Sequence, residues 1–222
     1  LLLIATAALY RSYVKSRILL LKQLTWMFCY FALFLLSFSL PAYFYPDNPT
    51  VIGYGFIVGI VFVCGILFWV IRIGRDVDIH LFRRLASVST YAITVAFVVA
   101  LFFLVYDFRL PITGKNGVIL WNINAFAMYL LAAACVYAGA IWSHCFYKAG
   151  KIVWQKDRIA ATKFFIFANN GITCGISALL VFSAKVEWVS LLGLALMGFA
   201  CAITMVIFLL PSRTSQIKQS FQ

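Results

Sequence analysis

Four asparagines are the side chains of this sequence best suited to build a polar site among apolar residues. Asn169 and Asn170 lie within one long apolar run, and Asn122 and Asn124 lie near the beginning of another. A primary amide carries two donors and an acceptor that hydrocarbon cannot satisfy, so such side chains face another helix, water or a ligand. We expect either interhelical hydrogen bonds or a polar pocket within the membrane, with Asn169 and Asn170 as the best candidates.

The two histidines and six cysteines are the residues with the chemistry to hold a metal or haem. His80 lies in a loop rich in arginine and aspartate, and His144 lies near the end of an apolar run. Histidines on different helices can ligate haem axially, but these positions favour ordinary interfacial histidines. The cysteines show no CxxC pair or metal-ligand spacing and are interpreted as small buried residues. We predict no metal site and no cofactor, with haem as an open alternative.

Charged side chains are absent from the middle of every apolar run, which argues against several reaction classes. Proton-coupled carriers and pumps place titrating groups on the path across the membrane. Ser183-Ala184-Lys185 is similar to the Schiff-base lysine neighbourhood of microbial rhodopsins, yet this lysine ends its run beside Glu187, so a pigment is only an alternative. The sequence also contains no nucleotide-binding loop, GxSxG or HExxH motif. We predict that the chain is not an enzyme.

Long apolar runs are the elements that must position these side chains. The 222 residues are 65% hydrophobic with a mean hydropathy of +1.02, far above a typical soluble domain. The sequence contains seven runs, of which the first is truncated: 1–10, 24–45, 51–73, 85–106, 117–147, 162–184 and 188–210. A transmembrane helix needs about 20 apolar residues, and a helix satisfies its own backbone hydrogen bonds in lipid. The sequence predicts one all-α domain over residues 1–222, a polytopic bundle of six full spans plus a truncated first span.

The distribution of lysine and arginine predicts the orientation of this bundle. All but three of the 18 basic residues lie in alternate loops and in the tail, and the exceptions are Arg109, Lys115 and Lys185. By the positive-inside rule, the N-terminus lies outside and the C-terminus is cytoplasmic, in a bacterial inner membrane. The net charge of +12 then indicates contact with anionic lipid of the inner leaflet rather than with nucleic acid. Because the chain begins at Leu1 and its first run is short, we expect the native chain to extend further.

Small residues recur at four-residue spacing in three of the runs, as glycine pairs in two of them and as Ala134 and Ala138 in a third. Gly55 and Gly59 form one pair, and Gly171 and Gly175 form another. Such spacing leaves a flat stripe on which a second helix can approach closely. We expect these glycines to serve helix packing within the bundle, with homodimerisation as the alternative.

The seven runs, the short outer loops and the stretch Tyr10-Arg11-Ser12-Tyr13-Val14-Lys15-Ser16-Arg17 resemble the N-terminal seven-helix sensor regions of bacterial histidine kinases and diguanylate cyclases. This resemblance implies a receptor that senses a lipid-soluble ligand or a membrane state. It also implies that a shift of the last helix passes the signal to an effector after Gln222.

Two other classes of protein fit the same features. A non-catalytic accessory subunit would use the basic inner face and the aromatic surface to hold other membrane proteins, lipids or pigments. A small uncoupled channel or carrier would need the Asn, Ser and Thr residues of the central runs to line one cavity. The expected partners are therefore membrane lipids together with other membrane proteins or further copies of the chain.

Overall fold

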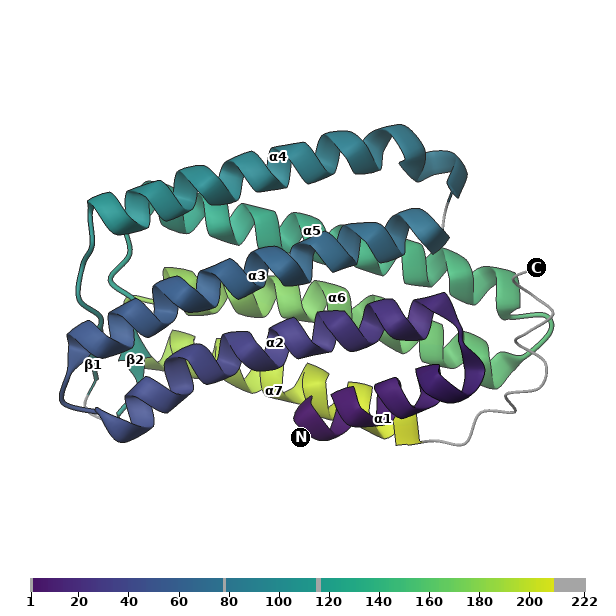
Figure 1. Ribbon diagram of the computed structural model, residues 1–222, viewed down its shortest axis with the longest axis horizontal. Coiled ribbons are helices and arrows are strands. Elements are labelled where there is room, and N and C mark those ends of the chain that lie inside the picture. Colours follow the sequence, from purple (N-terminus) through teal and green to yellow (C-terminus); the bar gives the residue numbers. More distant parts are fainter. Residues whose placement is uncertain (1, 78, 115–116, 210–222) are drawn as a thin grey trace.

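A computed structural model of the protein describes residues 2–77, 79–114 and 117–209 (Figure 1). It confirms the all-α class, because the described residues form seven helices and a single two-stranded hairpin. The helices are α1 (Leu2–Ser16), α2 (Leu19–Phe44), α3 (Pro49–Val77), α4 (Ile79–Tyr106), α5 (Ala125–Val153), α6 (Arg158–Ser183) and α7 (Glu187–Leu209).

Five of the described helices are long and apolar enough to cross a membrane, namely α2, α3, α5, α6 and α7. In α4 the apolar stretch that the structure describes is Tyr91–Tyr106, and α1 has 15 residues. Each of the five hydrogen-bonds its own backbone and presents apolar side chains, as hydrocarbon requires of a spanning element. The chain is therefore a helical membrane protein, and six full crossings stay a prediction.

Successive helices run in alternate directions and lie side by side (Figure 1). The most extensive contacts join α5 to α6 and α2 to α3, and α7 packs mainly against α6. The helices α3 and α5 also contact each other, and both contact α4. Among the described residues, α2 makes no extended contact with α7. The bundle is therefore tight on the side of α4 and looser between its second and seventh helices.

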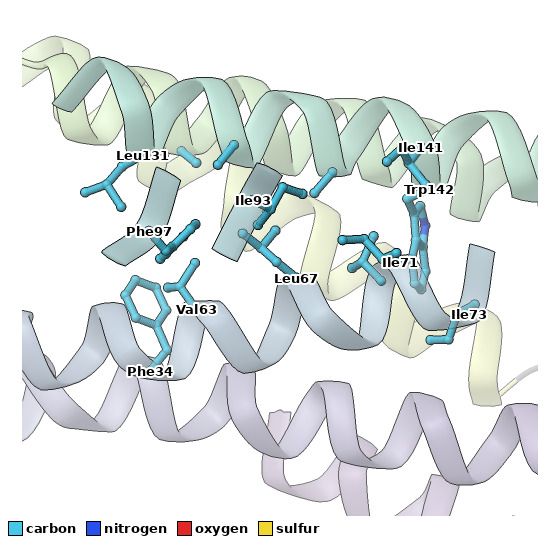
Figure 2. Close-up of a cluster of buried hydrophobic side chains, with 14 of the residues drawn as sticks. Phe34, Val63, Leu67, Ile71, Ile73, Ile93, Phe97, Leu131, Ile141 and Trp142 are labelled. Atoms are coloured by element: carbon cyan, nitrogen blue, oxygen red, sulfur yellow. The ribbon is translucent and has the colours of Figure 1, made fainter. Parts of the chain in front are cut away.

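The tight side is filled by interlocking apolar side chains (Figure 2). Val63 and Leu67 of α3 lie among Phe34 of α2, Phe97 of α4 and Leu131 of α5. Phe97 and Leu131 are each only 1% exposed. Since lipid tails are as apolar as these side chains, close packing rather than escape from water must hold the helices together.

The fifth helix begins later than the apolar run 117–147 suggests. Strand β1 (Ile112–Thr113) pairs antiparallel with β2 (Ile119–Leu120), and helix α5 starts only at Ala125. The Asn124 side chain accepts a hydrogen bond from the Phe126 backbone N–H at 2.9 Å, which caps the helix. The apolar residues before this cap therefore belong to a hairpin that covers one end of the bundle.

Candidate functional site: a central apolar cavity

A cavity of about 630 Å³ lies among helices α2, α3, α5, α6 and α7. Its walls consist almost entirely of aliphatic, aromatic and small side chains. The described residues that line it include no aspartate, glutamate, lysine, arginine or histidine. A cavity of this size and composition is typical of a site for an apolar small molecule.

One face of α7 forms a wall of the cavity along nearly the whole helix. Ser190, Leu194, Met197, Cys201 and Thr204 all line it. Their spacing of three or four residues places them on one side of a helix. Sequence reasoning missed this wall, because the neighbouring faces of α7 are equally apolar and no polar contrast marks the stripe.

Asn170 is the main polar group of the cavity and is 9% exposed. Its Nδ2 donates to Thr204 Oγ1 at 2.6 Å and to the Ala200 carbonyl oxygen at 3.2 Å. Thr204 Oγ1 in turn donates to the same carbonyl at 2.8 Å. Because a carbonyl oxygen can only accept, the nitrogen of the amide must be the atom that faces α7. The acceptor Oδ1 then points away from α7 and bonds to none of the described residues.

Ser190 is the second unusual polar group of the cavity wall. It is 1% exposed, and its Oγ has no hydrogen-bond partner among the described residues. An unsatisfied buried hydroxyl costs about 1–3 kcal/mol. Ser190 and Thr204 lie 14 positions apart on one helix, which is about 21 Å at 1.5 Å per residue. The cavity thus has a polar group near each end.

A close joint between α5 and α6 holds Asn170 in place. Trp142 Nε1 donates to the Phe167 carbonyl oxygen at 2.8 Å, and Ser143 Oγ donates to the Ala168 carbonyl oxygen. A Cβ added at Gly171 would lie 2.8 Å from both the Gly139 carbonyl oxygen and Ser143 Oγ. The two backbones can approach this closely only because both positions are glycine. The turn of α6 that carries Asn170 is therefore fixed against α5.

The hairpin covers the other end of the cavity. Val118, Ile119 and Trp121 all line it, and the Trp121 ring stacks on Phe56 of α3 with 4.0 Å between ring centroids. Gly114 lies against the Glu187 side chain at the start of α7. The segment that the sequence suggested as the start of a helix therefore forms a cover.

The candidate asparagines do not form one site. Asn169 is exposed on the outer side of α6, and Asn122 is exposed on the hairpin side of the bundle. Asn124 caps α5, and its Nδ2 donates to Asp107 Oδ2 at 2.9 Å. Of the four, only Asn170 lines the cavity.

Asp107 is the centre of a small charged cluster beyond the end of α4. Arg109 binds it in a forked geometry, with Nη2 at 2.6 Å from Oδ2 and Nε at 3.0 Å from Oδ1. The hydrogen bond from Arg109 and then that from Asn124 lower the pKa of the Asp107 carboxyl below its ordinary value. Because charge-assisted forks fix geometry, Arg109 holds the Asp107 carboxylate in place. The hydrogen bond from Asn124 to this carboxylate then links the end of α4 to the start of α5.

The predicted packing glycines lie inside the bundle. Gly55 and Gly59 face α2, where added Cβ atoms would meet Pro41 and Phe34, respectively. Gly175 faces α5, where a Cβ would lie 3.2 Å from the Val136 Cα. Their positions are those expected of residues that pack helices of one chain together.

The histidines are not brought into a common site by what the structure describes. His144 is exposed on α5 and does not line the cavity. The side chain of His80 lies outside the described residues. Within the part of the chain that is described, no group of three or more His, Cys, Asp or Glu side chains is placed to hold a metal ion.

Fold and site together define a class: a helical membrane protein with an apolar cavity between its helices and one buried amide, Asn170, in the cavity wall. A comparison with protein-family models, curated proteins and solved structures finds no match for the chain.

Proposed function

We propose that this protein is a seven-helix membrane receptor domain without a catalytic centre of its own, which binds a lipid-soluble ligand in its central cavity. The cavity of about 630 Å³ carries this proposal, because it is uncharged and has Asn170 in its wall. A receptor needs a site that a ligand can fill and an element that the ligand can move. The cavity and α7 supply these two parts.

Helix α7 is the element best placed to respond to a ligand. It packs mainly against α6, with smaller contacts to β2 and α1, whereas α5 and α6 share the most extensive interface. One whole face of α7 lines the cavity. A ligand that fits better with one position of α7 than with another shifts the population toward that position. By the resemblance to bacterial sensor regions, α7 would carry this shift to an effector.

The proposed orientation places the α1–α2, α3–α4 and α5–α6 connections in the cytoplasm. These connections share one end of the bundle (Figure 1), and most of the basic residues lie in them or in the helix segments that adjoin them. Cations lie over aromatic rings at the same end: Arg72 over Trp69 at 5.7 Å, Lys151 over Tyr147 at 4.7 Å, and Arg158 over Trp154 at 5.6 Å. Such pairs suit the headgroup region of a bacterial inner membrane, where anionic lipid attracts basic side chains.

Occupancy of the cavity can be tested by contact quenching of Trp142. The protein is placed in lipid nanodiscs with its other tryptophans replaced by phenylalanine, and 1-bromododecane is added. Bromine quenches only on contact, so a compound inside the cavity quenches this buried ring. Ala178→Phe places a ring in the cavity and should weaken quenching, whereas Ala195→Phe, on an exposed part of α7, should not. Equal quenching in both variants would remove the cavity as the site.

The receptor role needs a second measurement. Spin labels at the exposed Lys151 of α5 and Val206 of α7 report the distance between these helices. Helix shifts in switching proteins are about 1–2 Å. Binding should change the distribution of distances. If bromododecane quenches Trp142 but the distances do not move, the cavity binds a ligand without signalling.

The second candidate function is an accessory subunit of a larger membrane complex, and Asn169 favours it. This amide is exposed on α6, only one residue from Asn170. A polar side chain that faces lipid is costly, and a neighbouring protein would satisfy it. Asn169→Leu should then weaken co-migration with a partner on a native gel, whereas Asn170→Leu should not. A single band for the unmodified protein in mild detergent would count against the subunit.

A further inference from the structure

We propose that the natural occupant of the cavity is an uncharged lipid with one extended chain and a terminal hydroxyl, such as a long-chain or isoprenoid alcohol, with its hydroxyl on Asn170. This inference rests on the proposed ligand-binding function and adds the chemical class and direction of the ligand.

The length and volume of the cavity suit a single extended chain. Its polar groups at Ser190 and Thr204 are about 21 Å apart. A volume of about 630 Å³ spread over this length gives a mean cross-section of about 30 Å². Since apolar atoms in contact lie about 4.0–4.5 Å apart, one hydrocarbon chain fills about 20 Å² and two need about 40 Å². One extended chain fits along the cavity.

The lining selects an uncharged headgroup. The described lining residues carry no cation that would pair with a carboxylate or phosphate and no anion that would pair with an ammonium group. Moving an unpaired charge into such surroundings is far more costly than moving a hydroxyl that finds a hydrogen bond. Fatty acids, phospholipids and lipid amines in their charged forms are therefore disfavoured.

The hydrogen-bonding groups select the position of the hydroxyl. Both N–H bonds of Asn170 point to α7, so Oδ1 is left as an acceptor in the cavity wall. A hydroxyl donates to such an atom, whereas an ether or ester cannot. Ser190 is a weaker anchor, because a serine hydroxyl in a helix can turn to the carbonyl oxygen four residues earlier. Asn170 cannot turn its Oδ1 to another donor in this way while its Nδ2 donates to Thr204.

Two tryptophans allow the direction of the ligand to be measured. Trp142 lies beside the Asn170 turn of α6, and Trp121 lies under the hairpin at the opposite end of the cavity. Each is retained as the single tryptophan in an otherwise unmodified protein in nanodiscs. The probes are hexadecan-1-ol with bromine on carbon 2 or on carbon 16. The first should quench Trp142 more strongly than Trp121, and the second should show the reverse. The opposite pattern would overturn the proposal.

The hydroxyl contact is tested by competition against bromododecane. Hexadecan-1-ol should compete about tenfold better than hexadecane, which is the gain from about one buried hydrogen bond. Asn170→Leu should remove this advantage, while its neighbour Asn169→Leu and the opposite-end variant Ser190→Ala should keep it. Thr204 still satisfies the Ala200 carbonyl oxygen in Asn170→Leu, so no backbone acceptor is stranded. If Asn170→Leu does not fold, the quenching pattern of Trp142 and Trp121 still tests at which end of the cavity the hydroxyl lies.

Each failure has its own signature. If bromododecane and both bromohexadecanols leave Trp142 unquenched, the cavity does not take up ligands and the proposed function fails as well. If bromododecane quenches Trp142 but the alcohol competes no better than the alkane, only the assignment of a hydroxyl fails. If hexadecanoate at pH 9 competes as well as hexadecan-1-ol, the assignment of an uncharged headgroup is wrong.

Discussion

Asn170 Nδ2 donates to Thr204 Oγ1 across 2.6 Å, and this hydrogen bond joins α6 to α7 toward the end of the cavity opposite the hairpin. Both residues are buried and both line the cavity. Thr204 also donates to a carbonyl of its own helix, so the pair forms a short network rather than an isolated contact. The hydrogen bond that joins α7 to α6 therefore lies in the cavity wall that a ligand would contact.

Thr204→Val should remove this hydrogen bond while keeping the branched shape of the side chain. Interhelical hydrogen bonds in membrane proteins contribute about 0.6 kcal/mol on average and up to about 1.7 kcal/mol. We expect a loss of about 1 kcal/mol in the free energy of unfolding, measured by equilibrium unfolding in mixed micelles. Thr173→Val is the matched control, since that hydroxyl bonds only the Asn169 carbonyl oxygen of its own helix among the described residues. Equal losses of unfolding free energy in both variants would mean that the hydrogen bond between Asn170 and Thr204 adds no more stability than a hydroxyl bonded within its own helix.

Gly139→Ala should destabilise the contact between α5 and α6. A Cβ at this position would overlap the Gly171 carbonyl oxygen, which is backbone and cannot turn away. Overpacking of this kind costs about 1–3 kcal/mol. Gly198→Ala is the control, because a Cβ there meets nothing within 4 Å. The same unfolding measurement checks both, and a stable Gly139→Ala would show that the two backbones separate readily.

The cluster around Asp107 should loosen in acid. Arg109 and Asn124 hold the pKa of this carboxyl below its ordinary value of about 3.9. A lowered folded-state pKa gives stability that is present above the ordinary value and is lost as the pH falls through the lowered one. The hydrogen-exchange protection factors of residues 107–113 and 118–124, which correct for the intrinsic slowing of exchange in acid, should therefore fall below about pH 4. Asp107→Asn should remove this change in hydrogen exchange. If the change persists in the variant, the protonation of another group causes it.

The orientation predicts which positions react with a membrane-impermeant thiol reagent in intact cells. After the native cysteines are replaced by alanine, a cysteine at Asp47 should react, because the proposed orientation places the α2–α3 turn outside. A cysteine at Gln155 in the α5–α6 turn should react only after the cells are opened. Both positions are exposed, so access depends on the side of the membrane. The reverse pattern would invert the proposed topology.

The long apolar runs predicted the helices well, because length and continuous hydrophobicity leave few other structures possible in lipid. The beginning of α5 was placed too early, since Val118, Ile119 and Trp121 are as apolar as the helix that follows. Asn124 was the signal for the true start, because asparagine is a strong helix N-cap. It was interpreted as a buried amide instead.

The candidate site was only partly predictable. Asn169 and Asn170 are adjacent and chemically identical, yet one is exposed and the other lines the cavity. Successive helical residues point about 100° apart, and a helix that is apolar all round carries no pattern to show which direction faces inward. The packing of α6 between α5 and α7 decides this, and packing depends on distant parts of the chain.

The absence of charge from the described cavity wall has an electrical consequence. A membrane potential does work only on charge, at about 2.3 kcal/mol per elementary charge for each 100 mV. An uncharged occupant between uncharged walls gains or loses none of this energy when it enters or leaves. Energising or depolarising the cell should therefore leave the occupancy of the cavity by an uncharged lipid unchanged.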